Sequence, residues 1–434
     1  MSPVFVGVVA ISVLILLIFL RIPVGVALLV SGFIGNFYFM GMQPAVTQFQ
    51  LVVWELGSNF VLIALPLFVL MGQLAHQFHL GRDMYQCFNK WIGHFPGGLA
   101  ATSIVSSASF GSVTGSSLAT VAAIGKTLLP EMKQSELDQG YSAGTLASAG
   151  VLAILIPPSV PLVFYSAWTE TSLGDLFLAG LVPGLLLMLL FLIYVTAHGY
   201  LKKAGVSLES NYSWAEKIHA LWSLLPILMV LFTVLGSIYL GVATPTEAAS
   251  IGVTGIVLLV LFKRRFSLSS LKKSLEQSIY LTSNIVLLLL GGMLFSRFLV
   301  QTDLTNELIL WVSSLNASPE IVLLILVFIY LLLGAILDTF GMIILTLPFV
   351  FPLVQAIGVD PVWFGIFIVM MIELALITPP IGMNVFVIHR LDPSVPITKI
   401  YKGTFPFVVI SLIFVLVLIL CPDIALWFPR LLNS

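Results

Sequence analysis

Two short segments, each ending in a pair of prolines, carry the residues of this sequence that are best suited to chemistry. Residues 153–158 read Ala-Ile-Leu-Ile-Pro-Pro, and residues 375–380 read Ala-Leu-Ile-Thr-Pro-Pro. A proline lacks an N–H and disrupts the hydrogen bond of the carbonyl four residues earlier. A carbonyl freed inside a membrane needs another partner, and the unwound helices of transporters give such oxygens to sodium. We expect the freed carbonyls to be those of Ala153, Ile154, Ala375 and Leu376.

Two stretches rich in small and hydroxyl-bearing residues are the expected partners of these segments. Residues 97–125 are full of Ser, Gly and Thr, and residues 319–356 are interrupted by Gly334, Asp338, Gly341 and Pro348. Irregular backbone at membrane depth is tolerated only where protein buries it or where it lines a wet cavity. Both stretches are therefore predicted to be re-entrant helical hairpins. The oxygens that they and the second proline segment offer a cation belong to Ser112, Thr114, Ser116, Ser117, Asp338, Thr339 and Thr378.

The predicted result is two cation sites, one at each proline pair. A single pair is more simply explained as a helix kink whose carbonyls are satisfied by Ser, Thr and water, which is common in membrane helices. Two matched copies, each with a hydroxyl-rich hairpin, favour the cation sites over the kinks.

The hairpin tips are also expected to bind substrate. The N-terminus of a helix carries partial positive charge and unpaired N–H groups, which attract carboxylates, and Gly and Ser let the backbone approach a ligand closely. An organic acid therefore fits better than a sugar or an amine. A buried Asn is usually only a packing residue, so each candidate is weak evidence by itself. The candidate substrate-binding residues are Ser103, Ser112, Ser117, Ser159, Thr339 and Asn384.

Charged residues inside apolar segments are costly and usually functional. Asp338 lies in the second expected hairpin, which predicts a role with an ion or a proton. Glu247 and Glu373 lie within expected spans, and Glu373 is as easily a neutral or paired structural residue. Arg297 ends a span, where it either reaches the membrane interface or clamps a carboxylate.

Composition sets the class of protein. The chain has 434 residues, of which 59% are hydrophobic and only 9% charged, with a mean hydropathy of +1.12. Soluble domains carry about 25% charged residues, so this is a polytopic membrane protein in contact with lipid. The net charge of -1 gives no reason to expect a nucleic-acid partner. No phosphate-binding loop, zinc motif or nucleophile elbow occurs, and Cys87 and Cys421 form no motif, so an enzyme is not expected.

Runs long enough to span a bilayer predict the all-α fold. The first run is interpreted as a span, because it lacks the basic leader and cleavage site of a signal peptide. Residues 80–93 and 304–316 are amphipathic and are expected at the membrane interface. The expected spans are 3–20, 22–41, 59–77, 142–165, 175–199, 218–240, 244–262, 279–300, 361–388 and 404–428.

Lys and Arg cluster in alternate loops, as the positive-inside rule requires. The basic loops, expected in the cytoplasm, contain Arg82, Lys90, Lys126, Lys133, Lys202, Lys203, Lys217, Lys263 to Arg265, Arg390, Lys399 and Lys402. The remaining connections are acidic on balance. Both termini are then predicted on the outer, periplasmic side.

The sequence repeats itself. Pro157 and Pro379 are separated by the same interval as Pro23 and Pro245, and the interval from Gly111 to Gly334 is longer by a single position. Each half then has about five spans and one hairpin, an odd number of crossings, so the second half is expected upside down relative to the first. Inverted repeats with broken helices are typical of secondary transporters. We divide the chain into a scaffold and arm (1–95), a first hairpin with transport helices (96–205), a second scaffold and arm (206–316) and a second hairpin with transport helices (317–434).

Four motifs together resemble one family along essentially the whole chain. They are GSVTGSSLATVAAIG at 111–125, IPPS at 156–159, ATPTEAA at 243–249 and ITPPIGMN at 377–384. They resemble the large membrane subunit of tripartite ATP-independent periplasmic (TRAP) transporters, in the ion-transporter superfamily. The resemblance implies an elevator-type transporter in the bacterial inner membrane, coupled to at least two Na⁺ ions, that imports carboxylates such as C4-dicarboxylates or sialic acid. It also implies a separate four-helix membrane subunit and a periplasmic substrate-binding protein as partners.

The same resemblance assigns residues to the two sodium sites. Glu247 would match a scaffold glutamate of the family and Asp338 its hairpin aspartate. Ala153 and Ala375 stand where glycine is frequent in the family. A stand-alone sodium/carboxylate symporter is the alternative interpretation, and an anion channel is a more remote one. The first sodium site would use Thr114, Ser116, Ala153, Ile156 and Pro158, and the second Gly334, Ala375, Thr378 and Met383.

Overall fold

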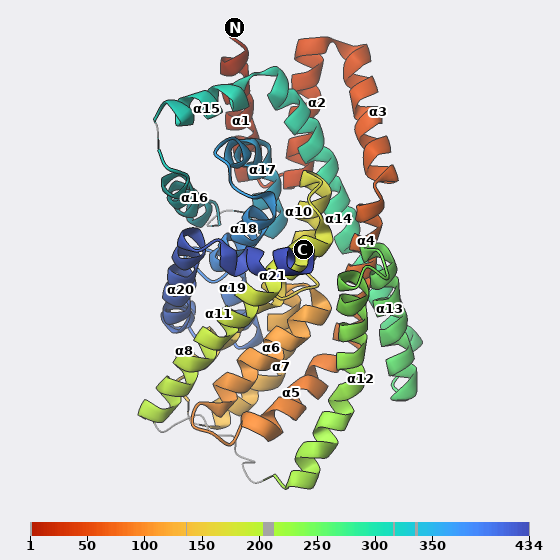
Figure 1. Ribbon diagram of the computed structural model, residues 1–434, viewed down its shortest axis with the longest axis vertical. Coiled ribbons are helices and arrows are strands. Elements are labelled where there is room, and N and C mark those ends of the chain that lie inside the picture. The colour runs from red at the N-terminus through yellow and green to blue at the C-terminus, as the bar shows by residue number, and fades with distance from the viewer. Residues whose placement is uncertain (1, 136, 203–211, 316, 335–336, 434) are drawn as a thin grey trace.

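The computed structural model describes residues 2–135, 137–202, 212–315, 317–334 and 337–433, and every regular element in these ranges is an α-helix (Figure 1). Lys203, one of the expected cytoplasmic cations, lies outside the described residues. The helices of the first half are α1 (Pro3–Phe19), α2 (Val24–Met40), α3 (Met42–Ser58), α4 (Phe60–Gln77), α5 (Leu80–Ile92), α6 (Gly98–Thr114), α7 (Ser117–Gln134), α8 (Gln139–Ala149), α9 (Leu152–Leu155), α10 (Val160–Thr169) and α11 (Leu173–Lys202). Those of the second half are α12 (Trp214–Tyr239), α13 (Pro245–Phe262), α14 (Leu268–Gln301), α15 (Leu304–Ser314), α16 (Pro319–Leu333), α17 (Thr339–Ala356), α18 (Pro361–Ala375), α19 (Met383–Leu391), α20 (Ile397–Leu420) and α21 (Asp423–Asn433).

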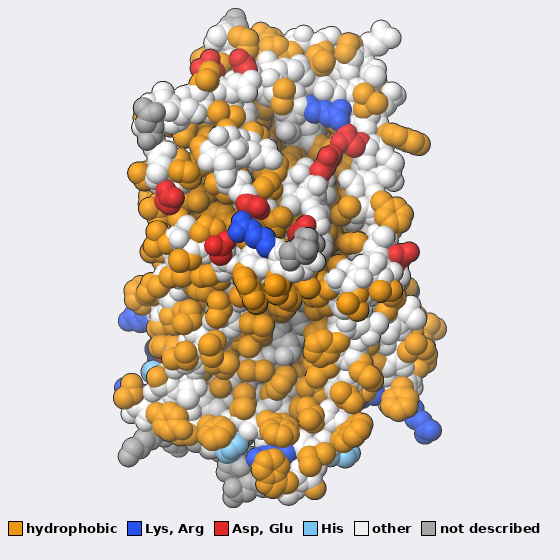
Figure 2. Space-filling view, in the orientation of Figure 1, with side chains coloured by type: hydrophobic (Ala, Val, Ile, Leu, Met, Phe, Trp, Pro, Cys, Tyr) orange, Lys and Arg blue, Asp and Glu red, His pale blue; other side chains and the backbone are white. Residues whose placement is uncertain are grey.

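The expected multi-pass membrane protein is confirmed. Seven of the described helices, α4, α11, α12, α13, α14, α17 and α20, are long and apolar enough to cross a bilayer. The α8–α9 segment and α10 together form an eighth candidate, bent by 41° at the break between them. Hydrophobic side chains cover the middle and lower part of the face in Figure 2; His and some of the Lys and Arg side chains lie toward its lower end, and others lie beside Asp and Glu in its upper half.

Two predicted spans are interrupted helices. Residues 142–165 were expected as one span, but the chain leaves the helix between Leu155 and Val160. Residues 361–388 were likewise expected as one span, but α18 ends at Ala375 and α19 begins only at Met383. Both interruptions contain a proline pair, whose missing N–H groups cannot continue a helix. We call them break one (residues 156–159) and break two (residues 376–382).

Two expectations about the scaffold need correction. Helix α3 was not predicted, because Gln, Thr and Glu lower the hydropathy of residues 42–58. Helix α14 was expected over 279–300 but begins earlier, at Leu268, where Ser267 caps it. In the first half, α3 and α4 are separate helices, since Asn59 starts α4 by accepting N–H groups of Val61 and Leu62. In the second half, the single helix α14 occupies the corresponding part of the chain.

The two halves repeat the same local devices at a constant spacing. The two expected hairpins are helix pairs, α6–α7 and α16–α17. The second helix of each pair is capped by Ser116 in the first half and by Asp338 in the second, at the same interval that separates the two proline pairs. The helices that precede the breaks are capped by Asp138 and Asp360, again at that interval, and each proline pair is joined by a cis peptide bond. The upside-down relation of the halves stays a prediction.

Candidate functional site

A cavity of about 320 Å³ lies where the tips of both hairpins meet. Thr114 and Ser116 reach it from hairpin one, Asp338 and Thr339 from hairpin two, and Met383 from the start of α19. Ser117 lines it as well. Six residues that the sequence marked as site residues, from segments in opposite halves of the chain, therefore share one cavity.

The tip of hairpin one is fixed by short-range hydrogen bonds. Gly115 ends α6 with a φ of +59°, a conformation that favours glycine. Ser116 then caps α7 by accepting the N–H of Ala119 at 3.4 Å. The hydroxyls of Thr114 and Thr120 lie 2.9 Å apart. The tip thus presents a helix N-terminus and the hydroxyl-bearing residues Thr114, Ser116 and Ser117 to the cavity.

The tip of hairpin two carries a carboxylate in the equivalent place. Asp338 accepts the N–H of Gly341 at 3.2 Å and so begins α17. No Lys or Arg lines the cavity within the ranges that the structure describes, and Asp338 is its charged residue. A carboxylate substrate entering the cavity would meet this charge unless a cation neutralised it.

Break one is enclosed by protein and leaves backbone oxygens without donors. Residues 151–160 are all buried. A Cβ placed on Gly111 would lie 2.2 Å from the Cα of Ala153, so glycine is required for this close packing of α6 on α9. No described residue donates a hydrogen bond to the carbonyl of Ala153, Ile154 or Ile156. The carbonyls that the sequence predicted to be free at this break are free.

Break two differs, and the corresponding expectation is wrong. The carbonyl of Leu376 accepts the N–H of Asn384 at 3.0 Å, and that of Ala375 accepts the N–H of Thr378 at 3.4 Å. The chain turns back at Gly382, which has a φ of +50°, and this turn brings Asn384 to Leu376. The hydroxyl of Thr378 is likewise engaged, since it donates to Leu374 at 2.7 Å.

Helix α20 supplies further donors to break two. The hydroxyl of Tyr401 lies 2.9 Å from the carbonyls of both Pro380 and Ile381 and donates to them. The hydroxyl of Thr404 donates to the carbonyl of Ile377 at 3.2 Å. Break two is therefore satisfied largely from within the protein, although Pro379 and Pro380 themselves are exposed.

Asn384 joins the two halves. Its amide nitrogen donates to the hydroxyl of Ser117 at 2.9 Å and to the carbonyl of Ala147 at 3.1 Å. Both hydrogens of the amide are thus used, which leaves the oxygen of Asn384 as the only atom it could offer a substrate. Glu373 is completely buried in α18, and Ser117 is the hydroxyl beside its carboxyl group.

The remaining predicted site residues lie outside the cavity. Three serines make local hydrogen bonds. The hydroxyl of Ser103 donates to the carbonyl of Ala100, and that of Ser112 donates to the carbonyl of Ser109. Ser159 caps α10 by accepting the N–H of Leu162. Glu247 forms a capping box with Thr244 at the start of α13, and Arg297 pairs with Glu55. The others do not line the cavity and lie at the end of α9 or in break one, at the end of α16, and at the end of α18 or in break two. They are Ala153, Ile156, Pro158, Gly334, Ala375 and Thr378.

Two cavity residues were missed from the sequence. Gln73 in α4 and Asn284 in α14 face the hairpin tips from the scaffold side of the cavity. A single amide in an apolar helix has no spacing that distinguishes it from a packing residue. The only indication of a functional role is the free energy that it costs to place a polar side chain inside a membrane.

This arrangement can be compared with known proteins. The family model described as "Tripartite ATP-independent periplasmic transporter, DctM component" matches residues 11–424. The chain belongs to this family. Its relatives include the C4-dicarboxylate TRAP transporter large permease DctM of Pseudomonas aeruginosa, 35% identical over 90% of this chain and 91% of the relative. The ectoine TRAP transporter large permease TeaC of Halomonas elongata is 30% identical over 95% and 96%.

A further relative is also a TRAP large permease, and one solved structure shares the fold. The sialic acid TRAP transporter large permease SiaM of Vibrio cholerae is 28% identical over 86% of this chain and 87% of the relative. Among solved structures, the YdaH transporter of Alcanivorax borkumensis matches with a TM-score of 0.63 over 90% of each chain, at 12% identity. At that identity the match shows the fold alone. The chain is a transporter permease and not an enzyme.

Proposed function

We propose that this TRAP permease is the translocating subunit of a sodium-coupled importer of organic carboxylates that receives its substrate from a periplasmic binding protein. The observation that carries the proposal is the cavity that both hairpin tips line, with the N-termini of α7 and α17, four hydroxyl-bearing residues and Asp338. Helix N-termini attract carboxylates. A bound cation would offset the charge of Asp338 and so link substrate binding to ion binding.

The first sodium ion is assigned to hairpin one and break one. Thr114 and Ser116 offer side-chain oxygens there, and Ala153, Ile156 and Pro158 offer carbonyls that accept no hydrogen bond from a described residue. Sodium binds oxygen ligands of this type. The chemistry of the ligands therefore fits the ion.

The second sodium ion is assigned to hairpin two and break two, with Gly334, Asp338, Ala375, Thr378 and Met383. A carbonyl oxygen has two lone pairs, so the bond that Ala375 accepts does not exclude a cation. Because this carbonyl already has a donor, the second site is less well supported than the first.

Transport would proceed by movement of the two hairpins, with α8–α10 and α18–α19, against the scaffold helices near 3–77 and 218–300. The chain would lie in the bacterial inner membrane with both termini periplasmic. A separate four-helix subunit would complete the membrane part. Cross-linking α4 to hairpin one through cysteines at Met71 and Val113, which line the same small apolar pocket, should stop uptake. Normal uptake by the cross-linked protein would contradict the elevator motion.

Reconstitution into proteoliposomes tests the coupling. Uptake of a radiolabelled carboxylate should require the small subunit, the binding protein and an inward sodium gradient. Uptake without the binding protein would support a stand-alone symporter, and uptake without a sodium gradient would support an anion channel.

The substrate class is proposed as small carboxylates of the C4-dicarboxylate or sialic acid type, since relatives at 35% and 28% identity are named for these ligands. Another relative is named for ectoine, a zwitterion, which is therefore the alternative substrate class. Titration of the partner binding protein with succinate, sialic acid and ectoine discriminates among them.

A further inference from the structure

A second polar cavity lies beside the arm helix α5. Its volume is about 490 Å³, and its walls include Gln77, Arg82, Asp83, Arg265 and Ser270. We call it the basic vestibule. It shares helices α4 and α14 with the cavity at the hairpin tips, but no residue lines both.

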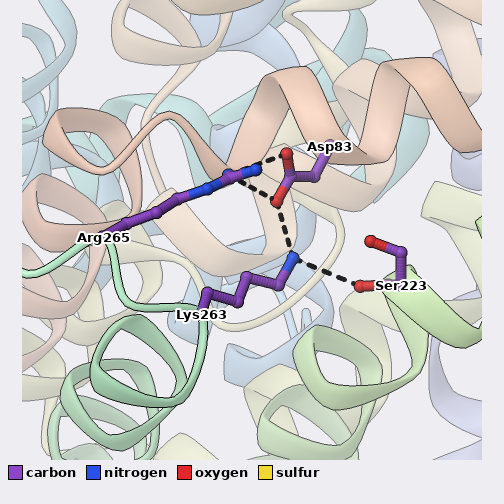
Figure 3. Close-up of polar contacts among 4 residues, drawn as sticks. All are labelled: Asp83, Ser223, Lys263 and Arg265. Atoms are coloured by element: carbon purple, nitrogen blue, oxygen red, sulfur yellow. Dashed lines mark hydrogen bonds and ion pairs between the residues drawn. The ribbon is translucent and has the colours of Figure 1, made fainter.

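The basic vestibule carries net positive charge. The carboxylate of Asp83 accepts a hydrogen bond from Lys263 at 2.6 Å, and both of its oxygens accept from Arg265 at 2.9 Å (Figure 3). Lys263 also donates to the carbonyl of Ser223 at 3.2 Å. One carboxylate thus faces two cations, while Arg82 is exposed and forms no ion pair with any described residue. An anion would be attracted to this wall.

A line of polar side chains connects the two cavities. Gln73, which lines the tip cavity, and Gln77, which lines the vestibule, are one helical turn apart in α4 and so lie on one face of that helix. On α14, Ser270, Gln277 and Asn284 recur at a heptad spacing, with Ser270 in the vestibule and Asn284 in the tip cavity. Both rows therefore run from one cavity toward the other.

Gln77 and Gln277 meet between the cavities. The amide nitrogen of Gln77 donates to the oxygen of Gln277 at 2.9 Å, which joins α4 to α14. Both side chains are flexible and uncharged, so parting the two amides breaks one exposed hydrogen bond. Such a pair can separate two aqueous spaces and still open readily.

We propose that the basic vestibule is the site through which the carboxylate substrate leaves toward the cytoplasm, the side on which the loops of Arg82 and Arg265 are expected. The Gln77–Gln277 pair is then the barrier between the vestibule and the tip cavity. This inference rests on the proposed import of anions. It assigns Arg82 to attract the departing anion and the amide pair to control access.

The test measures access to the tip cavity directly and needs neither sodium, binding protein nor transport. Gln73→Cys is introduced into a Cys421→Ser background, where the remaining cysteine, Cys87, is buried. Inverted membrane vesicles are treated with an anionic sulfonatoethyl or a cationic trimethylammonium methanethiosulfonate. The ratio of the two labelling rates at low salt reports the charge along the path.

We expect Arg82→Gln to lower the anionic-to-cationic ratio about threefold, and salt to abolish the difference. Gln77→Ala should raise both rates by removing the barrier. Arg390→Gln, which removes an exposed cation from the last turn of α19, is the matched control and should leave the ratio unchanged. The inference would be overturned if neither Arg82→Gln nor Gln77→Ala changed the labelling rates. It would also be overturned if Arg390→Gln lowered the anionic-to-cationic ratio as much as Arg82→Gln does. Because labelling is independent of uptake, failed sodium coupling would leave this result standing.

Discussion

The two broken helices share a sequence pattern but differ in what surrounds it. Break one is buried, and described residues donate no hydrogen bond to the carbonyls of Ala153 and Ile156. Break two has exposed prolines, yet its carbonyls accept bonds from Tyr401, Thr404 and Asn384. A buried carbonyl without a donor costs free energy, whereas one satisfied by a hydroxyl does not.

The difference arises in the helix that packs behind each break. Helix α20 brings the hydroxyls of Tyr401 and Thr404 to break two. Helix α11 packs beside break one through glycines: a Cβ on Gly184 would lie 2.6 Å from the side chain of Ile156, and one on Gly180 would lie 2.7 Å from the carbonyl oxygen of Leu155. Glycine has no hydroxyl to donate. Break one therefore depends on an outside ligand more than break two does, and the first proposed sodium site is the stronger of the two.

The largest expected effect comes from the caps of the two hairpin tips. Asp338→Ser would give hairpin two the cap of hairpin one, Ser116, so α17 should still form while the charge is lost. Uptake should fall by about a hundredfold, since a charge-assisted contact contributes roughly 1.5–3 kcal/mol. Asp360→Ser, which changes an aspartate cap outside the cavity, should keep most of the uptake. Equal uptake by Asp338→Ser and wild type in proteoliposomes would remove Asp338 from the site.

The next effect separates the two proposed sodium sites. Thr114→Val removes a hydroxyl at the tip of hairpin one and should raise the sodium concentration for half-maximal uptake about tenfold, equivalent to roughly 1.4 kcal/mol. Thr378→Val should raise it less, because the carbonyls of break two already accept hydrogen bonds from Asn384, Tyr401 and Thr404. A sodium titration of both variants checks the order. A larger shift in Thr378→Val would reverse our ranking of the sites.

Much of this site follows from the sequence because it rests on local rules. Ser116 and Asp338 are residues that cap helices, so the two hairpins were predictable from local sequence, and the proline pairs marked where backbone carbonyls lose their donors, although both segments were expected as single spans. The cavity that brings these residues together agrees with that prediction.

The rest depends on contacts between distant segments. Whether a freed carbonyl stays free is decided by Tyr401 and Thr404, which lie on the helix that follows α19. The role of Asn384 was predicted as substrate binding, but its amide hydrogens are used by Ser117 and Ala147. Helix α3 was missed because it is too polar for a hydropathy criterion. No spacing rule within one segment contains such information.

A smaller effect is expected where break two is satisfied internally. Tyr401→Phe removes the hydroxyl that serves Pro380 and Ile381 and should lower the free energy of unfolding by about 1–2 kcal/mol. Sodium affinity should change little. Tyr280→Phe, at an exposed position of α14, is the control. Thermal unfolding in detergent measures both variants; if Tyr401→Phe instead altered the sodium titration and left stability intact, break two would be an ion site that Tyr401 supports.

The smallest effect tests a surface contact between the halves. Lys133, near the end of α7, pairs with Asp392, which follows α19, at 2.7 Å. Burial alone would raise the pKa of Asp392, but the bonds from Lys133 and Ser394 outweigh it and hold that pKa below its ordinary value. The pair therefore stabilises the fold above the pKa of the unfolded carboxyl, and this contribution is lost as the pH falls through the folded pKa.

Lys133→Ala should accordingly cost about 0.2–1 kcal/mol at neutral pH, as half-exposed ion pairs do, and nothing in acid where Asp392 is protonated. Lys272→Ala removes the exposed pair with Glu276 within α14, at 3.8 Å, and should cost less. Unfolding midpoints at neutral and at acidic pH give the comparison. A cost of Lys133→Ala that is the same at both pH values would mean that the lysine contributes by packing on α7. The contact between the halves would then be apolar at this point, and the polar link between α7 and α19 would be the bond from Asn384 to Ser117.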